Sequence, residues 1–462
     1  MSDFVKGATA DAPSRRASRY APFPSPSADR RCLKRNVGLY AASVVVNFLT
    51  YAFGDPSILL STLAMKYDAP SWLIIFPMTA IMSIAYLPAI IMGWRLRPEM
   101  SRRRLYAGTL FLMYLPFVLP IVVLAAGADR STVLTALFVG TFASALGQGL
   151  TILPCWDLFA RLFPPHIRGV MVGSAAALGQ MASLVGGPLA AGLASADTPL
   201  PGWFPQWLVG WMHSLNAHLP FPRNYAVSLV IYLLGGWVYT LIILQMHENM
   251  PLPAAGSVVH PSFRQYLVRL RSAVAASASM RRLCVGGLCA AGLVATQPLL
   301  LVYTTQFRGF DRAQATLLLA ITPWVMIPFS LLLGYLSQKT GPRKIVAAAA
   351  VAVACAWTAA SLLHGNAVLI PLIFGSFVNV LYSFVLVCFM NAAPHGETHD
   401  YLAAYYAGGL VAGLNPFLLN ALMKLAPTTV VILVVLLSLG CAFCMLTSES
   451  AARRAASAKA SF

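Results

Sequence analysis

The chain has 462 residues, of which 58% are hydrophobic and only 10% are charged, and its mean hydropathy is +0.73. Because soluble domains carry about 25% charged residues, this composition excludes an ordinary soluble enzyme and a disordered scaffold. A net charge of +18 would suggest nucleic acid as the partner of a soluble chain, but the Lys and Arg residues here cluster between apolar runs. We therefore expect a membrane protein that binds no nucleic acid.

Residues 1–35 are rich in Arg, Ser, Pro and Ala. They lack the short apolar core and small-residue cleavage site of a signal peptide, so we expect a retained, disordered, basic cytoplasmic tail. Cys441 and Cys444 form a C-x-x-C inside a long apolar run with no neighbouring His or Lys. This setting favours small residues packed on a helix over a redox or metal centre.

Runs of mostly apolar residues dominate the rest of the chain. A helix needs about 20 such residues to cross a bilayer, and only helices satisfy the backbone of a single segment within lipid. We count twelve runs, which predict an all-α integral membrane protein with 12 transmembrane helices. The runs are 36–64, 70–93, 105–126, 131–153, 168–194, 225–246, 284–306, 313–336, 344–364, 367–390, 400–423 and 428–447.

The Lys and Arg residues predict the orientation, because cytoplasmic loops carry an excess of them. With the N-terminus inside, 26 of the 32 fall on inner segments. An even number of crossings places both termini in the cytoplasm, including the tail 448–462. We expect a multi-pass cell-membrane protein, with the bacterial inner membrane as its location. The six outer cations are Lys66, Arg130, Arg223, Arg308, Arg312 and Lys424.

Two connections are longer than the others. The linker 247–283 contains the piece SFRQYLVRLRSAV, which predicts a basic amphipathic helix on the anionic inner leaflet. The outer loop 195–224 repeats Trp203, Trp207 and Trp211 every four residues. This spacing is typical of an interfacial aromatic anchor, with a ligand platform as the alternative.

The two halves of the chain share sequence features at nearly constant offsets. Pro56 corresponds to Pro298 at an offset of 242, and the loop after the second run corresponds to the loop after the eighth at an offset of 241. Internal duplication is common in transporters. We therefore predict two pseudo-symmetric six-helix bundles, residues 36–246 and 284–447, joined by the linker 247–283.

The loops at this repeat carry a recognisable pattern. The second copy reads Gly334-Tyr-Leu-Ser-Gln338-Lys-Thr-Gly341-Pro-Arg343-Lys344, whereas the first copy keeps only Gly93 and the basic pair Arg102-Arg103. The layout resembles the major facilitator superfamily, whose inner loops read G-x-L-a-D-r-x-G-r-r/k. The resemblance implies that these loops pack helices together and latch an inner gate by charge pairing. Gln338 replaces the family's Asp, and the first copy lacks the acid too, so the usual latch loses its carboxylates.

Two further motifs of this family match in part. Gly187, Pro188 and Gly192 fit the antiporter signature of the fifth helix, although close helix packing alone explains small residues there. Gln148-Gly149 matches the end of the R-x-x-q-G motif of proton-coupled drug exporters, but Ala145 stands in place of the Arg. The mismatch argues against drug–proton antiport.

The resemblance implies that the first, fourth, seventh and tenth helices face a central path. Polar residues recur on these four runs at helical spacing. Each has a simpler explanation, because Ser and Thr bond their own helix and Asn and Gln join helices together. The candidate path residues are Asn47, Tyr51, Asp55, Thr141, Ser144, Gln148, Gln297, Tyr303, Asn379 and Tyr382.

Acidic residues in or near the membrane are few. Asp55 lies within the first run, directly before Pro56, and an ionisable group there suggests a function, which we take to be that of a proton carrier. A helix cap or a partner of Lys66 is the alternative. Asp157 and Arg168, at the inner ends of the fourth and fifth runs, are predicted inner-gate residues, as is the His395–Asp400 cluster, which has no defined metal-ligand spacing.

These features predict a secondary active or facilitative transporter, working by alternating access and not as an enzyme. The nearly uncharged lining favours a small neutral or weakly polar solute such as a sugar, polyol or amphipathic metabolite. We expect a monomer in the lipid bilayer without cofactor or metal, and both facilitated diffusion and proton coupling stay open. The alternatives are a non-transporting assembly factor or lipid-handling partner of the same fold, and a membrane enzyme using the His and acid clusters.

Overall fold

The computed structural model describes residues 26–56, 59–97, 100–194, 202, 204–248, 262–275, 277–294, 296–310, 312–393, 398–412 and 415–460. Every regular element within these ranges is helical. In chain order the elements are α1 (Pro26–Tyr51), η2 (Ala52–Gly54), α2 (Leu59–Lys66), α3 (Ser71–Thr79), the π-helical η3 (Ala80–Ile84), α4 (Tyr86–Arg95), α5 (Arg102–Tyr114), η4 (Leu115–Phe117), α6 (Val118–Ala125), α7 (Arg130–Leu162), α8 (Pro165–Ala194), α9 (Gln206–His218), α10 (Arg223–Leu244), α11 (Phe263–Ala275), α12 (Ala278–Val294), α13 (Gln297–Phe307), α14 (Arg312–Thr340), α15 (Pro342–Leu362), η5 (Gly365–Val368), α16 (Leu369–Gly375), α17 (Phe377–Ala392), α18 (Thr398–Ala412), α19 (Asn415–Leu425) and α20 (Pro427–Ala460).

The predicted all-α membrane fold is confirmed. In the described part of the chain, eight helices are long and apolar enough to cross a membrane, and the pair α12–α13, bent by 47°, makes a ninth if it forms one span. The other three predicted runs also fall on helix: α3–η3–α4, α14 and α18–α19. Twelve crossings therefore stay a prediction that agrees with the observed helices.

Breaks in the helices follow from proline and from crowding. The first span is interrupted between η2 and α2, where Pro56 cannot donate a backbone hydrogen bond, and a Cβ at Gly54 would overlap the Tyr232 ring. In the second span the helix widens into the π-helical turn η3 shortly after Pro77. Such irregular turns often mark functional positions.

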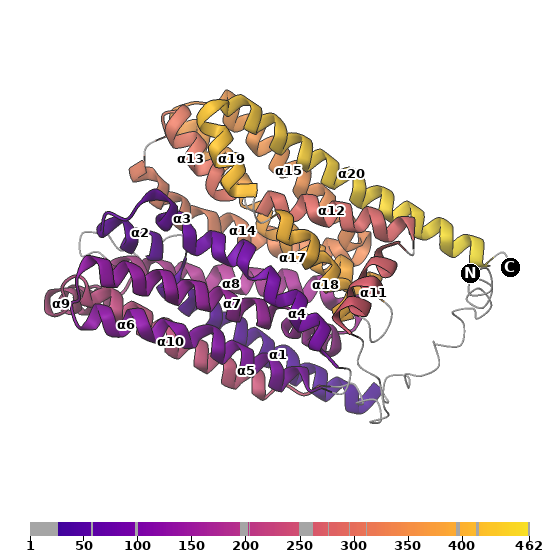
Figure 1. Ribbon diagram of the computed structural model, residues 1–462, viewed down its shortest axis with the longest axis horizontal. Helices are drawn as coiled ribbons and strands as arrows, with labels where there is room; N and C mark the ends of the chain where they lie inside the picture. Colours follow the sequence, from indigo (N-terminus) through magenta and orange to yellow (C-terminus); the bar gives the residue numbers. More distant parts are fainter. Residues whose placement is uncertain are drawn as a thin grey trace.

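The helices form two bundles, α1–α10 and α12–α20, drawn indigo to magenta and orange to yellow in Figure 1. The two bundles converge at the end where α4, α11 and α18 lie, whereas α2 and α3 lie apart from α13 and α19 at the other end (Figure 1). We call the converging end the basic end, after Arg102, Arg161, Arg168 and Arg343. The family-type loops after α4 and α14 both lie there.

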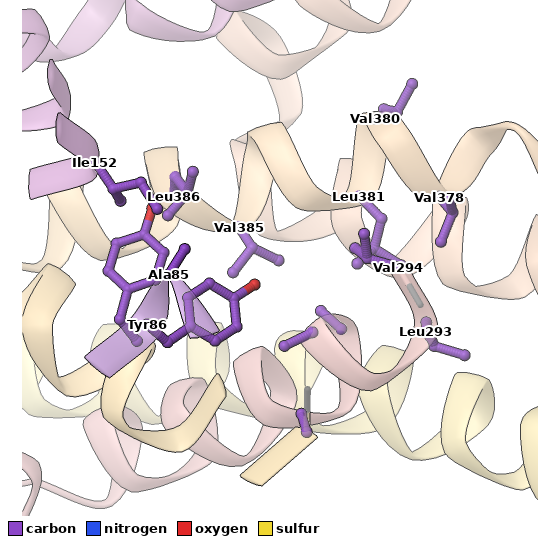
Figure 2. Close-up of a cluster of buried hydrophobic side chains, with 14 of the residues drawn as sticks. Ala85, Tyr86, Ile152, Leu293, Val294, Val378, Val380, Leu381, Val385 and Leu386 are labelled. Atoms are coloured by element: carbon purple, nitrogen blue, oxygen red, sulfur yellow. The ribbon is translucent and has the colours of Figure 1, made fainter. Parts of the chain in front are cut away.

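Contacts between the bundles run along α8 and α14 and through α4, α7 and α18. Small residues allow the closest approach, because a Cβ at Gly173 of α8 would lie 2.6 Å from the Cα of Gly334 in α14. Toward the basic end Ala85, Tyr86 and Ile152 of the first bundle lie beside Val385 and Leu386 of α17 (Figure 2). All five side chains belong to one buried apolar cluster that joins the bundles.

The Trp-rich loop 195–224, predicted to lie outside, contains α9. Trp207 and Trp211 are 73% and 53% exposed on this helix, while Trp203 lies outside the described residues. Exposed indole rings suit a membrane interface, and the aromatic anchor remains a prediction.

Candidate functional site

A pocket in the first bundle brings together four of the predicted path residues. Tyr51 of α1 and Thr141, Ser144 and Gln148 of α7 line it. The rest of the wall is apolar and aromatic, and periodicity alone did not reveal it because its members come from six other helical elements and from the break between η2 and α2. The wall consists of Gly54, Pro56, Leu60, Ile81, Met113, Phe117 and Tyr232.

Two glycines fix the position of Gln148. A Cβ at Gly149 would overlap the backbone carbonyl oxygen of Ala85, and one at Gly147 would lie 2.7 Å from the Cα of Met113. Because α7 therefore packs against backbone on both sides, the intervening Gln148 is held in the pocket wall. Gly149 is the residue that the partial drug-exporter motif also singled out.

The break in the first span places polar groups beside the same pocket. Asn47 accepts a hydrogen bond of 3.3 Å from the Tyr114 hydroxyl, and Tyr51 packs edge to face on Tyr232. Asp55 follows η2 and lies close enough to both Tyr51 and Tyr232 for electrostatic interaction. The half-buried Asp55 therefore lies near two residues, Tyr51 and Tyr232, that line the pocket.

The second bundle places its predicted path residues in different surroundings. Tyr303 is buried against Trp357 and accepts hydrogen bonds from Arg308, so its hydroxyl group serves a contact within its own bundle. Asn379 is exposed, and Tyr382 lies half-buried beside Tyr406. Gln297 begins α13, and its side chain lies outside the described residues.

Charged residues pack tightly at the basic end of the first bundle. The Arg102 guanidinium, fully buried, donates to the Asp157 carboxylate and to the carbonyl oxygens of Arg97 and Met100. Arg161 lies 3.6 Å from Asp157. The first loop motif lacks the family's acidic residue. Asp157 of α7 takes its place as the partner of Arg102, so a charge pair is still present there.

Glu248 extends this cluster. Its carboxylate lies 3.6 Å from Arg161 and accepts a 2.6 Å hydrogen bond from the backbone of Arg103. The Arg103 side chain donates to the Met246 carbonyl oxygen. These bonds tie the start of α5 to the chain that follows α10.

Two side chains at the basic end, Arg168 and Gln338, donate hydrogen bonds from one bundle to the other, and Arg168 also reaches the Met390 carbonyl oxygen at 3.4 Å. Arg168 of α8 donates to Asn391 Oδ1 at 3.0 Å, while its remaining nitrogens bond carbonyl oxygens of its own bundle. Gln338, in the place of the family's Asp, donates to the His166 carbonyl oxygen at 3.3 Å. The neutral amide therefore joins the bundles through a backbone oxygen that a carboxylate could not bind.

The remaining loop residues have mainly local roles. Gly341 has φ +89°, in the left-handed region that favours glycine, and precedes α15. Arg343 donates to Ser279 Oγ at 3.4 Å, and Lys344 is exposed. A Cβ at Gly93 would overlap the Tyr266 hydroxyl and lie 3.1 Å from Ala403 Cβ, so α4, α11 and α18 meet at this glycine.

Sequence reasoning missed the role of α11 in this closure. Tyr266 is 2% exposed against Gly93 of the first bundle, and Arg269 forms an ion pair with Asp400 of the second. Burial and the Asp400 carboxylate both raise the pKa of the Tyr266 hydroxyl, which therefore stays neutral. Of the predicted His395–Asp400 cluster, His399 and Asp400 lie here, 3.3 Å apart, whereas His395 and Glu397 lie outside the described residues.

Comparison with known proteins identifies the family. The profile of the Major Facilitator Superfamily matches residues 36–416. The chain belongs to this superfamily. It is thus a multi-pass membrane protein of a transporter family, and no protein with a curated description matches its sequence.

Solved structures of transporters share the fold. The E. coli fucose:proton symporter FucP is 18% identical, with a TM-score of 0.63 over 90% of this chain and 97% of that one. The human organic anion transporter MFSD10 is 15% identical, with a TM-score of 0.60 over 90% and 98% of the two chains. A bacterial homologue of the iron transporter ferroportin, in an outward-facing state, is 14% identical, with a TM-score of 0.57 over 89% and 99%.

Proposed function

We propose that this protein transports a small neutral or weakly polar solute by alternating access, and that the pocket in the first bundle binds the solute. The observation that carries the proposal is the convergence of Tyr51, Thr141, Ser144 and Gln148 on one pocket. Their hydroxyl and amide groups both donate and accept hydrogen bonds without charge.

The pocket wall also supports a neutral solute. The rings of Phe117 and Tyr232 offer apolar faces beside the polar groups, a combination that suits the CH faces and hydroxyl groups of a sugar or polyol. Small-molecule sites are typically apolar with a few well-placed polar groups. FucP, which shares the fold, is described as a fucose:proton symporter.

The closure at the basic end fits one state of an alternating-access cycle. Arg168 and Gln338 bond across the bundles there, while α2 and α3 lie apart from α13 and α19 at the other end (Figure 1). We assign this arrangement to the state in which the solute enters from the end away from the basic loops.

Uptake into proteoliposomes by the purified protein tests the proposal, with a panel of labelled sugars and polyols. Gln148→Ala removes one hydrogen bond worth about 1.4 kcal/mol, so we expect the KM to rise about tenfold. Gln206→Ala, on the exposed start of α9, is the matched control and should leave the KM unchanged. Absence of flux for the whole panel, with stable co-purification of another protein or a pigment, would instead indicate a non-transporting assembly or lipid-handling role.

We also propose that Asp55 carries the coupling proton. Its carboxyl group lies near Tyr51 and Tyr232, which line the pocket, so protonation and solute binding can influence each other. Asp55→Asn should abolish the acceleration of uptake by an imposed proton gradient while leaving equilibrium exchange of the solute. An unchanged response to the gradient would assign Asp55 to the helix break alone.

A further inference from the structure

The amphipathic helix α11 has one face packed against the protein and another that is exposed in the described part of the chain. Tyr266 and Leu270 are 2% and 5% exposed on the packed face. Leu267 and Val268 are 43% and 60% exposed on the other. The contacts of Tyr266 and Arg269 with the two bundles fix which face points away from the protein.

Cations accompany these exposed apolar side chains. At 100° per residue in an α-helix, Arg264 and Arg271 lie between Leu267 and Val268 on the exposed face. Both arginine side chains are exposed, and neither forms an ion pair or hydrogen bond within the described residues. Because α11 contains no Asp or Glu, this face is positively charged.

The end of α4 continues the same surface. The ring of Trp94 lies 5.5 Å from that of Phe263, and the guanidinium of Arg95 lies 4.4 Å from the Trp94 ring. Trp94 and Arg95 end α4 at the basic end, which the placement of Lys and Arg predicts to lie at the inner membrane surface. Aromatic rings with neighbouring cations are typical of this depth in a membrane.

We propose that the exposed face of α11, together with the Trp94–Arg95 edge, binds anionic phospholipid of the adjacent leaflet. Arg264 and Arg271 hold the phosphate and the headgroup charge, while Leu267 and Val268 contact the upper acyl chain. The charge of this face complements an anionic lipid and not a zwitterionic one. An acidic protein surface would match the charge of the arginines, but charged groups alone would not cover the aliphatic side chains of Leu267 and Val268, as an acyl chain would. Lipid binding at α11 does not depend on which solute the pocket accepts.

Native mass spectrometry of the full chain tests the site by titration with phosphatidylglycerol or phosphatidylcholine. We expect tighter binding of phosphatidylglycerol, and a loss of about 30-fold in Arg264→Gln/Arg271→Gln, from about 1 kcal/mol for each of two cations. Lys34→Gln/Arg104→Gln removes the same charge from exposed positions of the first bundle and should retain the affinity. An equal loss of phosphatidylglycerol affinity in both double variants would show that only the net charge of the protein matters, and it would overturn the proposal.

A second variant tests the apolar part of the site. Leu267→Ser/Val268→Ser keeps both arginines, and we expect it to weaken phosphatidylglycerol binding while leaving the weak binding of inorganic phosphate unchanged. Retention of full lipid affinity in this variant would show that the site recognises phosphate alone, contrary to the proposal. Absence of any preference for phosphatidylglycerol in the unmodified protein would overturn it as well.

Discussion

At the scale of single residues, glycines decide where polar side chains can act. Gly147 and Gly149 flank Gln148, and each faces the backbone of a neighbouring helix. Without side chains at these positions α7 can approach the neighbouring backbone, and Gln148 keeps its place in the pocket wall. Packing and function therefore depend on the same short segment.

Gly149→Ala should destabilise the protein by about 1–3 kcal/mol, because the new Cβ would overlap the Ala85 carbonyl oxygen and the helices would have to separate. Thermal unfolding in detergent measures the effect. Gly108→Ala is the control, since no atom lies within 4 Å of its Cβ position, and the better helix propensity of Ala should leave the melting temperature equal or higher. Equal melting temperatures for both variants would contradict the proposed packing role.

Asp129 caps α7 at the end opposite the basic loops. Hydrogen bonds from Thr132 to its carboxylate hold the pKa of Asp129 below its ordinary value. Since the folded state binds this proton less readily than the unfolded chain, the cap contributes fully above the ordinary pKa, and its contribution is lost as the pH falls through the folded pKa.

Asp129→Ala should therefore lower the melting temperature at neutral pH, with a difference from the unmodified protein that narrows in acid. Asp129→Asn keeps a capping oxygen without a titrating group and should not show this narrowing. If the melting temperatures of Asp129→Ala and the unmodified protein differ by the same amount from pH 7 down to strongly acidic conditions, the effect has a cause other than the carboxylate.

At the scale of elements, α11 links the two bundles at the basic end. It packs Tyr266 against α4 in the first bundle and pairs Arg269 with Asp400 at the start of α18 in the second. Asp400 is 2% exposed, and a buried carboxylate is costly without its partner.

A double-mutant cycle tests the ion pair between Arg269 and Asp400. Arg269→Gln leaves Asp400 buried without this cation and should destabilise the protein more than Arg269→Gln/Asp400→Asn, in which both charges are absent. Because the Arg269 side chain is 49% exposed, solvent screening limits the expected coupling to about 1 kcal/mol. Additive effects in thermal unfolding would show that the pair contributes nothing to closure.

At the scale of the whole molecule, α8 and α14 form the seam along which the bundles meet. A Cβ at Gly173 would lie 2.5 Å from the Ser330 carbonyl oxygen and 2.6 Å from Gly334 Cα. The bundles can be this close at the basic end only while these positions stay small.

Gly173→Trp should prevent that closure and reduce solute flux more than tenfold, while the protein still folds as two intact bundles. Gly187→Trp on the same helix, where no atom lies within 4 Å of the Cβ position, is the control and should keep most of the flux. Uptake and size-exclusion profiles measure both properties. Flux near the unmodified level in Gly173→Trp would mean that this close seam is not part of the transport cycle.

Apolar periodicity and length predicted the elements well. Each of the twelve apolar runs falls on helix, because a membrane span depends on local hydropathy and on backbone hydrogen bonds within one segment. Four path residues on the first and fourth runs, Tyr51, Thr141, Ser144 and Gln148, also meet in one pocket. Tyr303 was predicted to line the path on the same grounds, yet it is buried within its own bundle.

The sequence by itself determined the membrane-embedded helical architecture, which follows from composition and apolar runs along the chain, and its loop motif resembled the superfamily that the family profile then confirmed. The twofold repeat stays a prediction. Only the tertiary structure decided that Asp157 supplies the missing acid for Arg102, that Tyr232 and Phe117 complete the pocket, and that α11 bridges the bundles. Each of these contacts joins residues far apart in the chain. Such contacts depend on the rotation and the distance of one helix relative to another. Side-chain volume and backbone clearance determine both, and they act only once the helices pack together.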